Sequence, residues 1–323
     1  MKAIRVSSTG GPEVLEWADV TDPVAGHDSV VVEVEAAGVN FIDTYQRGGL
    51  YPMDLPFVPG LEGAGTIVEV GVDVAGLSIG DRVAWCSSLG SYAEKVAVPA
   101  ARLVTVPDGV DTATAAAVML QGLTAHYLAS DTFPLAPGDR CLVHAGAGGV
   151  GLLLTQIAKR RGAEVFATVG SEDKAELARG AGADHVILYR TRDFGDAVEE
   201  IAGPRPLDVV YDGVGRAVFG RSLDLLRPRG MLVQFGNASG PVDPVSPLQL
   251  MRSGSLFLTR PTLGDYTADR DELVGRTDDL FGWVRSGELD VRIGATFPLE
   301  RAAEAHRALE ARRTTGKVLL LPR

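Results

Sequence analysis

Short apolar runs rich in valine and isoleucine fill the first third of the chain, and glycine, proline or aspartate bounds most of them. Such runs are typical of β-strands, because branched side chains fit a pleated sheet and the bounding residues favour turns. The pattern predicts strands over residues 3–6, 29–34, 65–70, 82–85 and 93–98. We therefore expect a small, mostly antiparallel β-rich domain.

Farther along, apolar runs of strand length alternate with segments of helical period. A helix is expected over residues 111–129, with a break near Gly122. The predicted strands that follow are 140–145, 164–169, 185–188, 208–212, 231–235 and 256–259, with helices over 148–161 and 171–180. Alternation of this kind predicts an α/β fold with a doubly wound parallel sheet.

The last part of the chain has one clear helical segment, residues 271–286, and a second at 299–311. A final apolar run at 317–321 has the length of a strand. We expect this strand to return to the first domain.

A glycine-rich motif follows the first strand of the α/β part. Gly146, Gly148 and Gly151 have the spacing G-x-G-x-x-G, with Gly149 and Val150 between them. The motif alone is a weak signal, but here it follows a strand and opens a helix, which is the context of dinucleotide binding. Glycines let the main chain approach a pyrophosphate, which the N–H groups of the helix start then bind. We predict that these five residues bind a dinucleotide; a glycine-rich turn without a ligand is the alternative.

The end of the second strand indicates which dinucleotide binds. An NAD site usually carries an acid there to bond the ribose 2′-hydroxyl, whereas this chain has Gly170 and Ser171. Lys174 lies one turn farther along, and Arg190 follows Tyr189 after the third strand. A cation near the ribose would balance a 2′-phosphate. We therefore predict NADPH, with Gly170, Ser171, Lys174 and Tyr189 among its contacts.

Two acids, Glu172 and Asp173, stand against this prediction because they directly follow Ser171. Acids in the first turn of a helix have an ordinary explanation, since they interact favourably with the helix dipole. Lys174 has an ordinary explanation too, as a solvated helix lysine.

Composition excludes several classes of function. The 323 residues carry a net charge of −11, which opposes a broad nucleic-acid interface. No apolar stretch of 18 residues occurs, so we expect no membrane insertion. The two cysteines, Cys86 and Cys141, can form neither a disulfide framework nor a four-cysteine zinc site. A cytoplasmic protein is the expectation.

Several further stretches are informative when they are taken together: residues 38–45, 47–52, 59–60, 80–83, 145–151, 211–215, 235–237, 254–261 and 315–317. With these stretches the chain resembles one family over its full length, the zinc-independent quinone oxidoreductases of the medium-chain dehydrogenase/reductase superfamily. The resemblance implies a GroES-like β-rich domain from residues 1–123 and 263–323, a Rossmann domain from 124–262, and a cleft between them. It also implies a homodimer joined through the last Rossmann strand, around residues 255–259.

The zinc-dependent members of this superfamily bind catalytic zinc at three positions, which the resemblance places at Asn40, Leu61 and Gln121. None of these side chains is a thiolate or an imidazole, so we predict no metal. Without a Lewis acid to polarise an oxygen, substrates that are already electrophilic are expected. Quinones and activated alkenes fit this description.

The same resemblance assigns further roles. Asn40 and Tyr45, on the loop after the second strand, are expected to line the hydride-transfer pocket, and Tyr51 is a candidate proton donor. Gln121 replaces the lysine that is common in bacterial relatives of this branch. The replacement removes a positive charge that the resemblance would place near the nicotinamide ribose or a phosphate, so this contact stays open. Residues implied to contact the cofactor are Asn40, Thr124, Phe235, Asn237 and Lys317. Tyr45 could instead pack, Asn237 could simply form a turn, and Lys317 could open a surface strand.

We therefore predict NADPH-dependent reduction of quinones by hydride transfer. An NADPH-dependent alkene reductase acting on enones or enoyl thioesters, with Tyr51 as proton donor, is the first alternative. A nicotinamide-binding protein with a structural or RNA-binding role is the second. His144 is expected to be buried and structural, and no nucleophile–base pair is evident.

Overall fold

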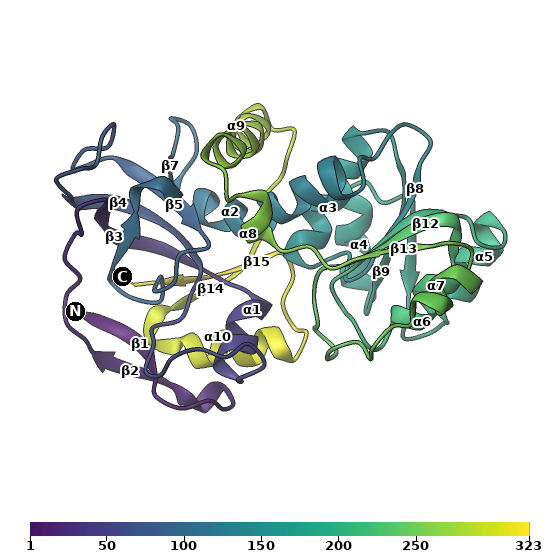
Figure 1. Ribbon diagram of the computed structural model, residues 1–323, viewed down its shortest axis with the longest axis horizontal. Helices are drawn as coiled ribbons and strands as arrows, with labels where there is room; N and C mark the ends of the chain where they lie inside the picture. Colours follow the sequence, from purple (N-terminus) through teal and green to yellow (C-terminus); the bar gives the residue numbers. More distant parts are fainter. Residues whose placement is uncertain (323) are drawn as a thin grey trace. The chain divides into compact units, whose positions relative to one another are not determined.

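The computed structural model describes residues 1–322, which divide into two compact units (Figure 1). Unit 1 comprises residues 1–123 and 267–323, and unit 2 comprises residues 124–266. The chain enters unit 2 at Thr124 and leaves it after Tyr266.

Unit 1 is built on a seven-stranded sheet and a two-stranded sheet. The larger sheet has the order β14 (Ile293–Pro298), β15 (Lys317–Leu321), β3 (Ser29–Val39), β4 (Glu62–Val70), β5 (Arg82–Cys86) and β7 (Leu103–Thr105), with β6 (Lys95–Pro99) pairing with β3. The smaller sheet pairs β1 (Lys2–Val6) with β2 (Leu15–Asp19). These pairs are antiparallel apart from the parallel pair of β14 with β15. The predicted antiparallel domain and the return of the final strand are confirmed.

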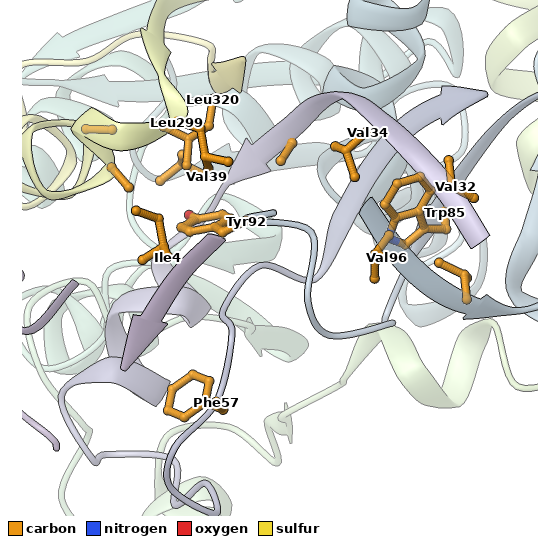
Figure 2. Close-up of a cluster of buried hydrophobic side chains, with 14 of the residues drawn as sticks. Ile4, Val32, Val34, Val39, Phe57, Trp85, Tyr92, Val96, Leu299 and Leu320 are labelled. Atoms are coloured by element: carbon orange, nitrogen blue, oxygen red, sulfur yellow. The ribbon is translucent and has the colours of Figure 1, made fainter. Parts of the chain in front are cut away.

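The core of unit 1 lies between these sheets and the helix that follows β14 (Figure 2). Trp85 and Tyr92 are its largest side chains and are fully buried. Ile4 from the first strand and Leu320 from the last contact the same cluster. Both ends of the chain thus contribute to one core, which explains why they form a single unit.

Four helices accompany these sheets. They are α1 (Phe41–Arg47), α2 (Thr112–Tyr127), α9 (Arg270–Ser286) and α10 (Ala302–Glu310), with short 3-10 turns at Pro12–Val14, Ala100–Arg102 and Leu299–Arg301. Residues 41–47 were expected to be a loop, and this prediction is wrong. Asn40 and Asp43 form a capping box, in which the side chain of each bonds the main-chain N–H of the other, and this arrangement starts a helix.

The predicted helix break near Gly122 is also wrong, because α2 continues through it and ends in a π-helical turn, Leu128–Thr132. A Cβ atom on Gly122 would lie 2.6 Å from Val118 Cγ2 and 3.2 Å from Leu280 Cδ1 of α9. The glycine therefore serves close helix packing rather than a turn.

Unit 2 is a six-stranded parallel sheet with helices between the strands. Its order is β10 (His185–Leu188), β9 (Glu164–Val169), β8 (Arg140–Val143), β11 (Leu207–Asp212), β12 (Leu226–Gln234) and β13 (Phe257–Thr259). The helices are α3 (Gly149–Arg160), α4 (Glu172–Gly180), α5 (Phe194–Ala202), α6 (Phe219–Asp224), α7 (Pro247–Arg252) and α8 (Leu263–Tyr266). The predicted doubly wound sheet is confirmed. The strand order reverses between β8 and β11, which is the arrangement of a doubly wound sheet with helices on both faces.

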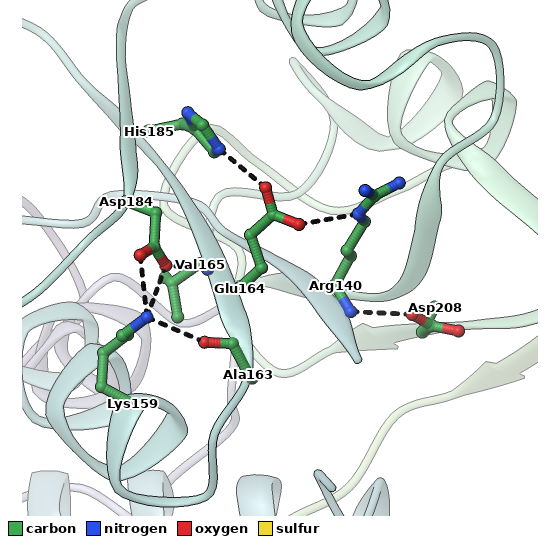
Figure 3. Close-up of polar contacts among 8 residues, drawn as sticks. All are labelled: Arg140, Lys159, Ala163, Glu164, Val165, Asp184, His185 and Asp208. Atoms are coloured by element: carbon green, nitrogen blue, oxygen red, sulfur yellow. Dashed lines mark hydrogen bonds and ion pairs between the residues drawn. The ribbon is translucent and has the colours of Figure 1, made fainter. Parts of the chain in front are cut away.

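The amino ends of these strands are joined by a polar network (Figure 3). Glu164 accepts hydrogen bonds from Arg140 Nε at 2.7 Å and pairs with His185 Nε2 at 2.8 Å. Lys159 donates to both oxygens of Asp184, at 2.8 and 2.7 Å. Side chains at the amino edge of the sheet therefore bond strands and helices to one another. The glycine-rich turn and the loops after β9 to β12 lie at the opposite, carboxyl edge. No helix among the described residues is long and apolar enough to cross a membrane.

Candidate active site

The glycine-rich segment forms the turn between β8 and α3. Gly148 is the N-cap of α3 and has no side chain to satisfy the first N–H groups of the helix. A Cβ atom on Gly151 would lie 2.4 Å from the carbonyl oxygen of Ala145, and one on Gly146 would lie 2.9 Å from Ala167 Cβ. Only glycine fits at these two positions. The N–H groups of Gly149 and Val150 lie in the first turn of α3, where a helix offers them no acceptor of its own, as an anion-binding loop requires.

The conformation of Ala145 and the hydrogen bonds of His144 hold this turn in place. Ala145 has a φ of 53°, a left-handed conformation that costs energy for a residue with a side chain. His144 is buried, and its ring nitrogens lie 2.9 Å from Thr168 Oγ1 and 2.9 Å from Ser222 Oγ. Burial lowers the pKa of His144 to about 3, so the ring is neutral. The prediction of a buried, structural histidine is confirmed.

Of the residues predicted to select the cofactor, Gly170 after β9 and Tyr189 after β10 lie side by side. A Cβ atom on Gly170 would lie 2.7 Å from the Tyr189 hydroxyl and 3.5 Å from Arg190 Nε. Gly170 thus leaves room beside a phenol and a guanidinium. Ser171 is the N-cap of α4, and its hydroxyl bonds no N–H of that helix. This corner combines a cation with a hydroxyl, which suits a phosphate.

The acids that opposed an NADPH assignment have partners or positions elsewhere. Glu172 Oε1 accepts a hydrogen bond of 2.7 Å from Arg179 on the same helix. Asp173 is exposed in the first turn of α4. The local objection to a 2′-phosphate is therefore removed for Glu172.

The loops after β11 and β12 are bonded to each other. The main-chain N–H of Phe235 donates to the carbonyl of Asp212 at 2.8 Å, and Asn237 Oδ1 accepts from Gln234 Nε2 at 2.9 Å. Asp212 Oδ1 in turn accepts from two N–H groups of the next loop, while Oδ2 is buried without a partner among residues 1–322. Burial raises the pKa of Asp212 to about 6. Asn237 therefore takes part in the turn after β12, as one of the two alternatives from the sequence has it, and this turn lies at the carboxyl edge of the sheet.

In unit 1, four buried or half-buried polar side chains form what we term the Asn40 cluster: Asn40, Glu62, Gln121 and Lys317. Asn40 Oδ1 accepts from Lys317 Nζ at 3.0 Å and from Gln121 Nε2 at 3.2 Å. Asn40 Nδ2 donates to Glu62 Oε1 at 2.5 Å, and Glu62 Oε1 is in ionic contact with Lys317. Glu62 Oε2 accepts the N–H of Leu120 at 2.7 Å, which ties the cluster to α2.

Lys317 opens β15, as predicted, but the surface location considered from the sequence is wrong, because its side chain is only 1% exposed. Burial lowers its pKa below the ordinary value, and the charge of Asp43 opposes that shift. A Cβ atom on Gly38 would lie 2.5 Å from Lys317 Cε and would overlap Glu62, so the neighbouring strand needs glycine there. The ion pair explains how a lysine can lie inside this unit.

A second chain of polar side chains holds α1, the helix that begins at Asn40. Asp43 Oδ2 accepts from the N–H of Asn40 at 2.8 Å and from the Tyr92 hydroxyl at 2.9 Å. The Tyr92 hydroxyl also lies 3.1 Å from Nε2 of His306, whose Nδ1 lies 3.1 Å from Arg47 Nη1. Burial raises the pKa of Asp43 to about 6 and lowers that of His306 to about 3. The start and the end of α1 are thereby tied to one buried network.

Two tyrosines lie on α1 and on the loop that follows it. The rings of Tyr45 and Tyr51 contact edge to face, with centroids 5.4 Å apart and an interplanar angle of 71°. The N–H of Tyr51 donates to the carbonyl of Tyr45 at 3.1 Å. The structure therefore brings the two predicted tyrosines together, on a helix and the loop that follows it.

The donor set of the Asn40 cluster does not fit zinc. Two of the three expected positions, Asn40 and Gln121, are indeed adjacent, but both carry amides, and Leu61 has no donor atom. The neighbouring carboxylate, Glu62, is already engaged by an ammonium group. Within the described part of the chain, no group of three histidine, cysteine or acidic residues is arranged to hold a metal. No step is therefore assigned to a metal ion.

The predicted residues fall into two groups, one in each unit. Unit 2 holds the glycine-rich turn, Gly170, Ser171, Lys174, Tyr189, Phe235 and Asn237 at or near the carboxyl ends of parallel strands, with Thr124 on α2. Unit 1 holds Asn40 and Lys317 in one cluster and Tyr45 with Tyr51 in one pair. Sequence reasoning missed Glu62 and Asp212. An acid among small and apolar residues at the start or end of a strand was the available signal for both.

Comparison with known protein families matches both parts of the chain. Residues 26–108 match the alcohol dehydrogenase GroES-like domain, and residues 149–272 match the family described as zinc-binding dehydrogenase. The GroES-like and Rossmann-type domains predicted from the sequence are therefore confirmed.

Individual proteins are similar over nearly the whole chain. A quinone oxidoreductase of Pseudomonas aeruginosa is 46% identical, with 99% of each chain covered. A 2-haloacrylate reductase of a Burkholderia species is 41% identical, covering 99% of this chain and 98% of that protein. The structure of an Escherichia coli quinone oxidoreductase complexed with NADPH superposes with a TM-score of 0.97 at 41% identity, covering 100% of both chains.

Proposed function

The chain belongs to the quinone oxidoreductase family of the medium-chain dehydrogenases/reductases, and from that premise we propose that it reduces quinones with NADPH and without a metal ion. The observation that carries the proposal is the corner at Gly170, where a hydroxyl and a guanidinium stand in place of the acid of an NAD site. The relatives named quinone oxidoreductase, one of them solved with NADPH, support it.

The residues present fit NADPH. The N–H groups of Gly149 and Val150 would bind the pyrophosphate, since glycines at 146, 148 and 151 leave space for it. Gly170, Ser171, Lys174 and Tyr189 would hold the 2′-phosphate end, with Arg190 nearby. Thr124, Phe235 and Asn237, which lie in the same unit, would contact the rest of the cofactor. When bound, NADPH supplies a hydride to the substrate.

The chain's own contribution to quinone reduction is position and exclusion of water. Asn40 is held by three partners, so its amide cannot rotate without breaking hydrogen bonds. Tyr45 and Tyr51 offer aromatic faces and edges to a flat ring. A quinone needs no dedicated acid, because the reduced oxygens can take protons from water.

A second function, alkene reduction, is favoured by the 2-haloacrylate reductase relative. There the hydride adds to one alkene carbon and a proton must reach the neighbouring carbon. The Tyr51 hydroxyl is the proposed donor, because a phenol can protonate a basic carbanion or enolate. A quinone reductase would not depend on that proton.

Turnover measured with a panel of acceptors separates these functions. We expect NADPH oxidation with quinones, much slower oxidation of NADH, and no loss of activity with a chelator. Tyr51→Phe should leave quinone turnover within about threefold and, if alkenes are substrates, reduce turnover of an activated alkene by orders of magnitude. Preference for NADH would contradict the assignment of the Gly170 corner.

We further propose a cytoplasmic homodimer joined at the outer edge of β13. This strand is the last of the sheet, and Phe257 on it is 56% exposed, with Leu248 and Met251 of α7 exposed to a similar extent. An apolar edge strand without cover is a site of pairing between chains. Phe257→Lys should convert a dimer into a monomer in light scattering, whereas Ile201→Lys, on exposed α5, should not. A monomeric wild type would refute this proposal.

A further inference from the structure

His306, on helix α10, is a buried titratable side chain that has no part in the function proposed above. Its Nδ1 lies 3.1 Å from Arg47 Nη1, and its Nε2 lies 3.1 Å from the Tyr92 hydroxyl. The same hydroxyl lies 2.9 Å from Asp43 Oδ2. Asp43 is in the first turn of α1, and Arg47 is the last residue of that helix. His306 and Tyr92 therefore join the two ends of α1.

The guanidinium at one end of this chain sets the direction of every hydrogen bond in it. Arg47 has only donor hydrogens, so Nδ1 of His306 must accept. A neutral ring then carries its one hydrogen on Nε2 and donates it to the oxygen of Tyr92. The Tyr92 hydroxyl is left to donate its own hydrogen to Asp43, whose Oδ2 also accepts the N–H of Asn40. The chain therefore runs one way, from Arg47 to Asp43.

Other protonation states of the His306 ring do not fit these contacts. A hydrogen on Nδ1, in the other neutral tautomer or in the imidazolium, would face the guanidinium of Arg47 donor against donor. In the other neutral tautomer, Nε2 would also accept from Tyr92 and take its hydroxyl hydrogen away from Asp43. Burial and the charge of Arg47 lower the pKa of His306 to about 3, which keeps the ring neutral.

The surroundings of this chain leave its members little freedom to move. Tyr92 is fully buried and contacts the His306 ring edge to face, with centroids 5.8 Å apart. Arg47 is also buried, and it donates to the Gly10 carbonyl at 3.1 Å and to the Glu310 carboxylate at 2.5 Å. Buried polar groups with several partners change their contacts only at a cost in free energy, so the chain holds one arrangement.

We propose that His306, as its Nε2–H tautomer, is a positioning residue for the two tyrosines of α1 and its following loop. By joining both ends of α1 it fixes the helix that carries Tyr45. Tyr51 follows, because its N–H donates to the Tyr45 carbonyl at 3.1 Å. The inference rests on the proposed function, under which both rings face the quinone. His306 acts on them through Arg47 and Tyr92.

The tautomer is tested on the wild-type protein with ¹⁵N-labelled histidine, because long-range ¹H–¹⁵N correlation distinguishes a protonated ring nitrogen from an unprotonated one. The chain has five histidines, and the spectrum of Tyr92→Phe identifies His306 by the change in its signals. We expect a protonated Nε2 and an unprotonated Nδ1 from about pH 8 down to about pH 5. A hydrogen on Nδ1 anywhere in this range would overturn the inference, because the chain would then run differently.

The positioning role is tested by steady-state kinetics of Tyr92→Phe, which removes the hydroxyl of the chain and keeps the ring. We expect the KM for a quinone to rise about three- to tenfold, the effect of one hydrogen bond, with kcat and the KM for NADPH within about twofold of wild type. His306→Leu should have the same effect. His306→Gln should largely restore the wild-type KM, because an amide can both accept from Arg47 and donate to Tyr92. Thr277→Val, which also removes one buried hydrogen bond of unit 1, is the control and should change none of these constants.

An unchanged KM for the quinone in Tyr92→Phe would overturn the inference, while leaving the proposed function intact. An equal rise of the KM for NADPH, or an equal effect of Thr277→Val, would overturn it too, because loss of stability alone would then explain the result. Failure of the wild type to reduce any quinone with NADPH would instead overturn the proposed function. If His306→Leu does not fold, Tyr92→Phe and the spectrum of the wild type still decide.

Discussion

At the scale of single residues, buried polar atoms separate structure from function in this chain. Most buried polar groups have partners, as proteins require. The exceptions include Gln121 in the Asn40 cluster, Asp212 at the carboxyl end of β11, and Thr155 inside helix α3. Thr155 points to no proposed ligand, so its unpaired hydroxyl should be a plain cost to stability.

Two buried helical threonines test this cost. Thr155→Val removes a hydroxyl that has no partner, so we expect the free energy of unfolding to rise by about 1 kcal/mol. Thr277→Val removes a hydroxyl that donates to the Leu273 carbonyl at 2.6 Å, so we expect a fall of about 1 kcal/mol. Urea unfolding of both variants measures the difference. Equal effects would mean that Thr155 has a partner after all.

The glycine-rich turn offers a second comparison. An alanine at Gly151 would push its Cβ against the main chain at Ala145 and Gly146, so we expect Gly151→Ala to weaken NADPH binding at least about tenfold. Gly282, exposed on α9, has no atom within 4 Å of such a Cβ, and Gly282→Ala should raise the free energy of unfolding by about 0.5–1 kcal/mol. Calorimetric titration and urea unfolding check the two results. Unchanged NADPH affinity in Gly151→Ala would argue against this turn as the pyrophosphate site.

Prediction of single residues from the sequence succeeded where a residue type in a given local pattern has few structural roles. Glycines at fixed spacing after a strand predicted the turn between β8 and α3, and His144 was correctly expected inside. Lys317 was ambiguous, because its burial depends on Glu62, which is 255 positions away in sequence (317 − 62). Pairing over such a distance leaves no local pattern.

At the scale of elements, boundaries followed apolar periodicity well and failed where polar side chains start a helix. Strands β9, β10 and β15 have the predicted bounds. Helix α1 was missed, because its seven residues show little period and depend on Asn40 and Asp43 as caps. The N-caps of α4 and α9 allow a test of how much a cap contributes to stability.

Ser171 and Asp269 are both N-caps, but only the side chain of Asp269 bonds N–H groups of its helix. Asp269 accepts from the N–H groups of Asp271 and Glu272, so Asp269→Ala should lower the free energy of unfolding by about 1 kcal/mol. Ser171 caps no N–H of α4, so Ser171→Ala should change stability by less than about 0.5 kcal/mol. We expect it to raise the KM for NADPH severalfold, because the hydroxyl is available for the phosphate. A large loss of stability with an unchanged KM would reverse the two assignments.

At the scale of the whole molecule, the type of each sheet was the most predictable feature. Alternating strands and helices implied a parallel sheet, and the short β-type runs implied an antiparallel one. The Asn40 cluster was less accessible, because Asn40, Gln121 and Lys317 come together from segments far apart in the sequence. The response of the whole molecule to pH likewise depends on groups that only the fold buries.

His144 gives that response a definite sign. Its pKa is lowered from 6.5 to about 3 in the folded protein, so between these values the unfolded chain binds a proton that the folded protein does not. The stability that neutral His144 contributes is therefore lost as pH falls below about 6.5, by about 2 kcal/mol at pH 5. Asp43 and Asp212 have raised pKa values, so their contributions to stability rise as pH falls. Both residues are present in wild type and in a His144 variant, so their contributions cancel when the two proteins are compared.

His144→Asn isolates this contribution. At about pH 7 the variant should be less stable than wild type, because hydrogen bonds to Thr168 and Ser222 are weakened or lost. On acidification to about pH 5 the wild type should lose about 2 kcal/mol more than the variant, so the gap between them narrows. Urea unfolding at the two pH values measures the gap. A gap that stays constant would mean that His144 takes up a proton in the folded protein, and that the turn above it is less closed to water than its burial indicates.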